Sequence, residues 1–313
     1  SKKPVFARIF TVQYFPIAQN QILFFYIRNI KMKKFLSVFL ALAMIACVVA
    51  GFAGCSKSGK DDEVVPYSSS KGDTTVKTVA DLDKVKDANK IVVGITDYEP
   101  IDYKVKGSDE WVGFDADLVR AVADKMGIKV EFVVINWDNK FIELNSGTID
   151  CIWNGMTVSD SVKKNCDISD AYAGNSQVVV MKKDALSKYK DKDAVKAANL
   201  TIAVEKGSAG EAEAKKLSNN IVSLSAQSDA LQEVKSGTAD ACIIDSTMAN
   251  SMTKEGTDFS NLGYSISLTT EEYAAGFRKG SDLTAEVNRI LAELKTDGTM
   301  DKLSEKYGVN LAK

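Results

Sequence analysis

The chain has 313 residues, of which 45% are hydrophobic and 26% charged. These values exclude a chain that is disordered or membrane-embedded throughout, and the length predicts about two domains. The net charge is −2, yet residues 1–54 contain seven Lys or Arg and no acid. Subtracting those seven from the total of 40 leaves 33 bases against 42 acids after residue 54, a net charge of −9. A body of this charge repels nucleic acid, so we expect no nucleic-acid partner.

The basic N-terminal segment has the order of a secretory signal. Met32-Lys33-Lys34 precedes an apolar run at 35–50, which is short for a membrane span, and Ala53-Gly54-Cys55 follows. We predict a lipoprotein signal peptide at 32–54, because Phe52-Ala53-Gly54-Cys55 resembles a bacterial lipobox, whose cysteine is acylated after cleavage. An ordinary cleaved signal with Cys55 as a bystander is the alternative.

Two further segments lie outside the predicted folded body. Residues 1–31 are aromatic-rich and lack a periodic pattern, and we interpret them as an upstream extension that is not native. Residues 55–87 begin with a stretch rich in Ser, Gly, Lys and Asp, which predicts a flexible tether. The expected location is therefore extracytoplasmic, secreted to the cell surface or periplasm, with a lipid anchor to the membrane on Cys55.

The chemistry-bearing residues argue against a metal or cofactor. The chain has no histidine, and Cys151, Cys166 and Cys242 are an odd number without CxxC spacing. Histidine is the commonest metal ligand and general base, so hydrolytic triads and zinc sites are not expected. We predict no cofactor, no metal and no catalytic residue.

Beyond residue 88, strand-like and helix-like patterns alternate, which is typical of an α/β fold with parallel strands covered by helices. The predicted strands are 91–95, 129–135, 148–153, 201–205, 221–224 and 239–244. The predicted helices are 114–127, 138–145, 208–217, 228–235 and 246–252. A Ser-Gly-Thr turn at 146–148 and again at 236–238 introduces a strand each time, which predicts two similar lobes that offer strand ends to one crevice.

Several motifs then resemble one family. They are GFDADL at 113–118, NWD at 136–138, SGTID at 146–150, NGMT at 154–157, DISDAY at 167–172 and the closing stretch at 293–308. In this order they resemble the polar amino-acid family of periplasmic-type solute-binding proteins, the bacterial extracellular solute-binding protein family 3, from about residue 89 to 310. The resemblance implies a two-lobed periplasmic-binding-protein-like fold (type II), with two parallel-rich sheets joined by two crossing strands.

The resemblance also implies the domain limits and the function. Lobe 1 would comprise 88–176 plus 278–313, lobe 2 would comprise 181–272, and the hinge would lie at 177–180 and 273–277. The expected function is capture of an amino acid, polar or basic, by lobe closure, for delivery to the permease of an ABC importer. The expected protein is a monomer. An enzyme on the same fold, of dehydratase or transglycosylase type, and a ligand-sensing partner of a receptor are the alternatives.

The family's site maps onto several residues of this chain. Asp245 matches the aspartate that binds the ligand's α-ammonium, although a helix N-cap is the alternative. Tyr98 and Trp137 match its aromatic walls, for which core packing is the alternative. Asn154, Gly155 and Thr157 match the segment that contacts both ends of the ligand. These roles are implied by the resemblance alone.

The second lobe adds further candidates. Ser208 and Ala209, in the glycine-rich turn 207–210, open a helix whose N–H groups suit an anion. Glu205, with Asp97 and Asp245, makes the crevice electronegative and favours a ligand with extra nitrogen; a solvated Glu205 is the alternative.

One position departs from the family pattern. The arginine that usually grips the ligand's carboxylate is Val162 here, and the neighbouring Lys163 and Lys164 lack its planar fork.

Overall fold

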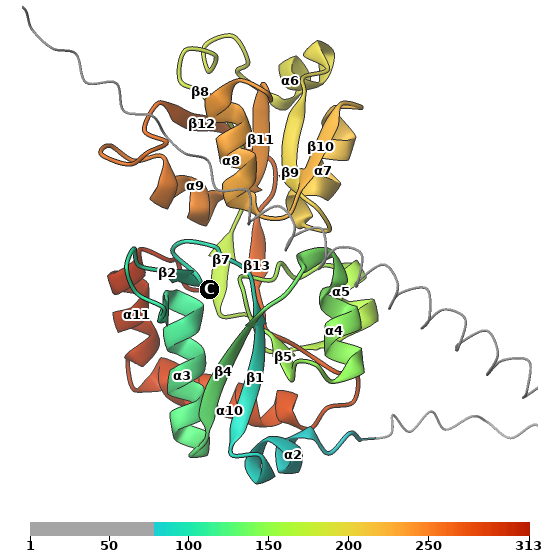
Figure 1. Cartoon of the computed structure of the whole chain (residues 1–313), viewed down its shortest axis with the longest axis vertical. Coiled ribbons are helices and arrows are strands. Elements are labelled where there is room, and N and C mark those ends of the chain that lie inside the picture. Colours follow the sequence, from blue (N-terminus) through green and yellow to red (C-terminus); the bar gives the residue numbers. More distant parts are fainter. Residues whose placement is uncertain (1–77) are drawn as a thin grey trace, which may run out of the picture. The chain divides into compact units, whose positions relative to one another are not determined.

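Residues 78–313 are described by a computed structural model, and they belong to a single unit with two lobes, one on each of two five-stranded sheets (Figure 1). The predicted extension, the signal peptide, Cys55 and the tether up to residue 77 lie outside the described residues. The last residues of the predicted tether are not flexible chain, because 81–87 form a helix that buries Val85 and pairs Asp81 with Arg278. Within 78–313, no helix combines the length and the apolar character that crossing a membrane requires.

Lobe 1 is built on a mixed sheet. In spatial order its strands are β4 (Lys129–Val134), β1 (Lys90–Ile95), β5 (Cys151–Ile152), β14 (Gly276–Phe277) and β6 (Asp167–Ile168). The first three run parallel, whereas β14 is antiparallel to both neighbours. The apolar run 91–95 forms β1, an inner strand between β4 and β5 that is largely buried because helices cover both faces of a parallel sheet.

Helices on both sides of this sheet complete lobe 1. They are α2 (Asp81–Asp87), α3 (Phe114–Met126), the 3₁₀ turn η1 (Trp137–Asn139), α4 (Lys140–Ser146), α5 (Asp160–Asn165), α10 (Leu283–Thr296) and α11 (Thr299–Tyr307). A short hairpin joins β2 (Tyr103–Lys104) to β3 (Trp111–Val112). The apolar face of α3 is buried at Leu118, Val119 and Val122, and Gly127 ends the helix with φ 71°.

Lobe 2 repeats this plan. Its sheet order is β10 (Ile221–Leu224), β9 (Ile202–Glu205), β11 (Ala241–Asp245), β8 (Gln177–Lys182) and β12 (Leu262–Ser267). Again three strands are parallel, and β8 runs antiparallel to both neighbours. The helices are α6 (Lys192–Ala198), α7 (Ala209–Leu217), α8 (Gln227–Ser236) and α9 (Ser246–Met252).

The two Ser-Gly-Thr turns have the same structure in the two lobes. Gly147 ends α4 with φ 79°, and Gly237 ends α8 with φ 87°. In each turn the serine and threonine hydroxyls are hydrogen-bonded, at 2.9 Å in the first and 2.5 Å in the second. The expected α/β class and the two-lobed arrangement of parallel-rich sheets are confirmed.

Two antiparallel strands, β7 (Ala173–Asn175) and β13 (Glu271–Tyr273), lie between the lobes (Figure 1). Residues 177–180, where the first crossing was expected, are instead part of the buried strand β8 in lobe 2. The chain thus passes between the sheets a few residues earlier than expected, since residue 176 already separates β7 from β8. The exact lobe limits stay a prediction.

Candidate functional site

A cavity of about 480 Å³ lies between the lobes, where the carboxyl ends of parallel strands from both sheets meet. Tyr98 follows β1, Asn154 follows β5, and Glu205 and Asp245 end β9 and β11. Strand ends of this kind are where open α/β sheets place their ligands. Nine of the ten residues predicted for the site line this cavity: Tyr98, Trp137, Asn154, Gly155, Thr157, Glu205, Ser208, Ala209 and Asp245.

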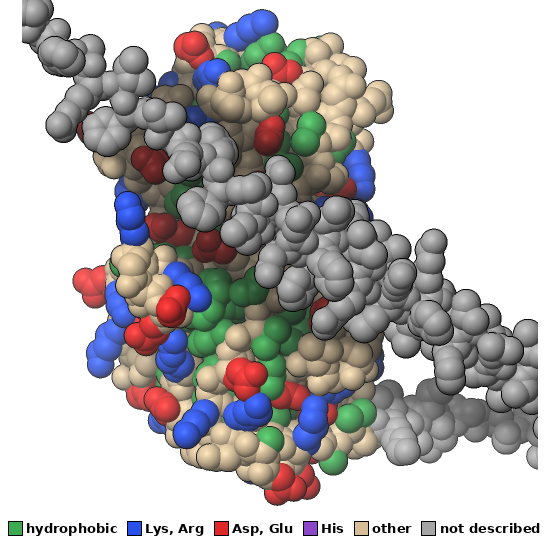
Figure 2. Space-filling view, in the orientation of Figure 1, with side chains coloured by type: hydrophobic (Ala, Val, Ile, Leu, Met, Phe, Trp, Pro, Cys, Tyr) green, Lys and Arg blue, Asp and Glu red, His purple; other side chains and the backbone are tan. Residues whose placement is uncertain are grey.

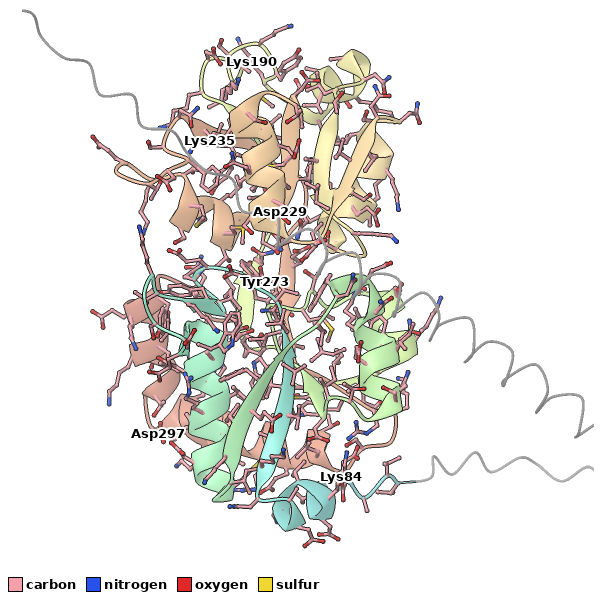
Figure 3. All side chains as sticks on the ribbon, viewed as in Figure 1. Lys84, Lys190, Asp229, Lys235, Tyr273 and Asp297 are labelled. Atoms are coloured by element: carbon pink, nitrogen blue, oxygen red, sulfur yellow. The ribbon has the colours of Figure 1, made fainter. Side chains whose placement is uncertain are left out.

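Asp97 is the exception, because its side chain is exposed and does not line the cavity. Partial burial raises the pKa of Asp97, and the charges of Glu99 and Asp229 add to that effect. On the face shown in Figure 2, acidic side chains gather where the lobes meet, and Figure 3 shows Asp229 at that junction. Asp97 therefore lies outside the cavity wall, near the acids Glu99 and Asp229.

Asp245 is held in place by amide groups. Its carboxylate accepts hydrogen bonds from the side chains of Asn175, Gln177 (2.6 Å) and Gln227. The side-chain oxygen of Gln227 (Oε1) in turn accepts from the backbone N–H of Asp245 at 2.9 Å. Burial raises the pKa of Asp245 to about 6, with the charge of Glu271 as the next cause. Asp245 also precedes α9, but its side chain makes no capping bond there. The carboxylate is therefore free of the alternative N-cap role.

Glu271, which the sequence did not single out, stands beside Asp245. The same two amides, those of Asn175 and Gln177, donate to Glu271 Oε1 at 2.7 and 2.6 Å. Thr157 Oγ1 also donates to this oxygen, at 3.0 Å. Two carboxylates that share amide donors at a cavity wall form a site for a cationic group. Nothing in the sequence places Glu271 there, because β13 reaches the cavity only through its pairing with β7.

Glu205 is buried, with 3% of its surface exposed, and it lines the cavity. Within residues 78–313 its carboxylate has no hydrogen-bond partner. Burial raises the pKa of Glu205 to about 8, and the charge of Asp245 adds to this, whereas Lys140 opposes it. Glu205 is therefore mostly protonated at neutral pH in the ligand-free protein, and a cationic group in the cavity would favour its ionised form. The solvated position at the lobe edge, considered from the sequence, does not describe this side chain.

The aromatic residues have distinct environments. The Tyr98 and Tyr273 hydroxyls are 2.6 Å apart and fully buried, and Figure 3 shows Tyr273 between the lobes. Trp137 is 7% exposed and lines the cavity from η1. Trp153 is buried against Tyr172 and lies in the core.

The 154–157 segment is positioned by buried acids. Both N–H groups of the Asn154 amide are taken, by Thr96 O and Asp102 Oδ2, so the side chain has none left for a ligand. The Gly155 N–H donates to Asp115 Oδ2 at 2.7 Å. With φ 56°, and with Tyr98 2.8 Å from a Cβ built at this position, residue 155 can only be glycine. Asp115, in the GFDADL motif, thus holds the backbone of this part of the cavity wall in place through its hydrogen bond with Gly155.

The start of α7 offers backbone donors. Ser208 caps the helix by accepting from Glu211 N at 3.1 Å, so its hydroxyl is committed to the fold. The N–H of Ala209 has no acceptor within residues 78–313, and Ala209 lines the cavity. This part of the helix supports an anionic or carbonyl group.

The lobes touch beside the cavity. Lys140 Nζ of α4 donates to Gly207 O at 2.9 Å, and Lys206 forms an ion pair with Asp138 at 2.9 Å. On another side Ser251 Oγ donates to Glu99 Oε1 at 3.1 Å. Among residues 78–313, no cluster of His, Cys, Asp and Glu is arranged to hold a metal ion.

Comparison with known proteins decides the family. Residues 91–310 match the model of the bacterial extracellular solute-binding proteins, family 3. The chain belongs to this family. The arginine-binding extracellular protein ArtP of Bacillus subtilis (strain 168) is 30% identical to it over 291 residues, which cover 88% of this chain and 98% of ArtP.

Two solved structures of amino-acid-binding or substrate-binding proteins agree in fold. The ancestral amino acid-binding protein AncCDT-1, a precursor of cyclohexadienyl dehydratase, is 35% identical with a TM-score of 0.68, over 73% of this chain and 99% of that one. An ABC uptake transporter substrate-binding protein from Streptococcus pneumoniae with bound histidine is 30% identical with a TM-score of 0.67, over 74% and 97%. The family resemblance and the type II fold expected from the motifs are confirmed.

Proposed function

We propose that this family 3 protein captures an amino acid between its lobes and delivers it to the permease of an ABC importer. The proposal is supported chiefly by the cavity, in which Asp245 and Glu271 stand together at the ends of two different elements. An ammonium group is the natural occupant of such a pair, since buried charges require a counter-charge. Relatives named as arginine-, glutamine- and histidine-binding proteins support an amino acid as ligand.

The cavity favours a basic or polar amino acid. Besides Asp245 and Glu271, its wall carries the unpartnered carboxylate of Glu205 and the aromatic face of Trp137. A second nitrogen on the ligand's side chain would satisfy Glu205, and aromatic faces suit cationic groups. The ligand residues in this proposal are those of the cavity wall already described, without Asp97.

The lobe contacts support capture by closure. Three pairs of residues join the lobes: Lys140 with Gly207, Asp138 with Lys206, and Glu99 with Ser251, the first of each pair in lobe 1. These contacts join the lobes beside the cavity, and in the proposed function they break and form as the lobes rotate about β7 and β13. Outside the described residues, we propose that the chain is a monomeric lipoprotein anchored through Cys55 and exposed on the extracytoplasmic side.

Ligand capture is tested directly on the purified protein. Native mass spectrometry would identify a co-purified small molecule, and isothermal titration with the twenty standard L-amino acids would measure affinities. We expect micromolar or tighter binding of at least one basic or polar amino acid. If none of the twenty binds, amino-acid capture is wrong. One of the similar solved structures is a precursor of a dehydratase, so the enzymatic alternative is tested as well. If the bound ligand is recovered unchanged after long incubation, the protein binds the ligand without converting it.

A further inference from the structure

Lys140 is a buried cation without an anionic partner. Only 6% of its surface is exposed, and its Nζ donates to two backbone carbonyls, Trp137 O at 3.0 Å and Gly207 O at 2.9 Å. An ammonium has three N–H donors, so one remains. No carboxylate of residues 78–313 lies within ion-pair distance of Lys140 Nζ. Its direct contacts are therefore with neutral groups, the two carbonyl oxygens and the nearby rings of Trp137 and Phe141.

Lys140 also lines the cavity, where it is the only basic residue among the described ones. The acids of the wall are Glu205, Glu213, Asp245 and Glu271. Burial lowers the pKa of Lys140 to about 8, while the charges of Glu205 and Asp138 oppose that shift. At neutral pH the cavity thus contains one cation and an excess of acids.

The other positions considered for binding a carboxylate bring no positive charge to the cavity wall. Val162 lines the cavity but is apolar, and it packs in the cluster of Ile152, Met156 and Cys166. Lys163 and Lys164, considered from the sequence as substitutes for an arginine, are exposed and do not line the cavity. Lys206 is exposed and paired with Asp138. Only Lys140 can supply a positive charge to a bound anion.

We infer that Lys140 binds the carboxylate of the ligand and makes the site selective for ligands that carry a free carboxylate. The inference rests on the proposed function, and it assigns the two ends of the amino acid. The α-ammonium lies at Asp245 and Glu271, and the carboxylate lies at Lys140 and the free N–H of Ala209 at the start of α7. The protein itself holds the ammonium of Lys140 with neutral acceptors only, so that the ligand provides the missing negative charge.

The test compares each amino acid with its own α-carboxamide, in which an NH2 group replaces one carboxylate oxygen and the negative charge is lost. The tightest ligand of the twenty is titrated together with its amide at pH 7; for L-arginine this is L-argininamide. We expect the parent protein to prefer the acid by roughly 10- to 100-fold, as expected for one charged hydrogen bond. In Lys140→Met the acid should weaken by that factor, while the amide changes by less than about threefold.

Four control variants make the result specific. Lys163→Met and Lys164→Met remove exposed lysines next to Val162 and should keep the full preference for the acid. Lys140→Arg retains the charge and should keep most of it. Lys140→Met combined with Val162→Arg places a cation on α5 and should recover at least part of the preference, which also shows that the Met variant folds.

The outcomes separate this inference from the function on which it rests. Equal binding of acid and amide by the parent overturns the role of Lys140 but leaves capture of an amine standing. A preference that persists in Lys140→Met overturns it as well. If Lys140 serves only as a counter-charge to Glu205, Lys140→Met should bind both the amino acid and its amide more tightly than the parent does. The two affinities should then rise by the same factor, which would overturn the inference. Failure of the parent to bind any amino acid would remove the function and the inference together.

Discussion

Gly207 of lobe 2 lies directly against Asp138 of lobe 1, since a Cβ built on Gly207 would come within 2.8 Å of the Asp138 Cα. Gly207 also has φ 74°, so any other residue is strained there. The adjoining ion pair of Lys206 with Asp138 joins the lobes at the same place. Closure of the cavity thus requires a residue without a side chain at this position.

A Gly207→Ala substitution should therefore prevent full closure. We expect ligand affinity to fall about tenfold or more, because the added methyl group collides with backbone that cannot give way. Gly127→Ala is the matched control, since Gly127 has φ 71° and open space around its Cα. Both variants lose about 1–2 kcal/mol of stability from backbone strain, but only the first should lose affinity by titration. Equal affinities for the two variants would show that this contact does not limit closure.

Asp245 should be the acid whose charge the ligand needs most. Asp245→Asn keeps the shape but removes the counter-charge of a buried ammonium, which commonly costs about 3–5 kcal/mol, or two to four powers of ten in affinity. Titration calorimetry with the tightest amino acid measures this loss. Asp124→Asn, on the exposed surface of α3, should bind like the parent. Unchanged binding by the Asp245 variant would place the ammonium elsewhere.

The ligand-free protein should become less stable as the pH rises from 5 to 8. Burial raises the pKa of Glu205 to about 8 and that of Asp245 to about 6, so the folded state holds more protons than the unfolded state in this range. The free energy of unfolding then falls with increasing pH, by about 1–3 kcal/mol. Lys140, with its pKa lowered to about 8, has the opposite influence only above that pH.

Chemical unfolding at several pH values measures this slope, and Glu205→Gln isolates the contribution of one group. The variant should be more stable than the parent at pH 8 and similar to it at pH 5. A cationic ligand should bind the parent more tightly at pH 8 than at pH 5.5, because Glu205 and Asp245 are ionised to a greater extent at the higher pH. A parent whose stability is the same at pH 5 and pH 8 would contradict the raised pKa of Glu205.

Cys55 lies outside the described residues, and its acylation is tested separately. Cys55→Ser in the producing cell should release the protein from the membrane fraction, because multiple acyl chains are what hold a lipoprotein stably. Fractionation followed by immunoblotting measures the shift, and Cys47→Ser, within the apolar run of the signal, is the control. Membrane association that survives Cys55→Ser would favour an ordinary cleaved signal.

The sequence alone determined the fold class and most of the cavity wall. Apolar runs such as 91–95 and 202–204 reveal strands because strands buried on both faces must be apolar throughout. The family resemblance assigned Asp245 and Glu205 to the crevice, and both end parallel strands at one edge of the lobe 2 sheet, where such folds bind ligands. The turns at Gly147 and Gly237 marked the repeated lobe plan, since left-handed helix ends favour glycine.

Only the tertiary structure decided how charges are distributed within that wall. Glu271 reaches Asp245 through amides from another strand, and Lys140 reaches Gly207 across the lobes, so each contact joins residues far apart in the chain. Asn154 turned inward because the buried carboxylate of Asp102 requires a donor. Sequence patterns report which face of an element is buried, whereas the pairing of buried polar groups depends on which elements meet.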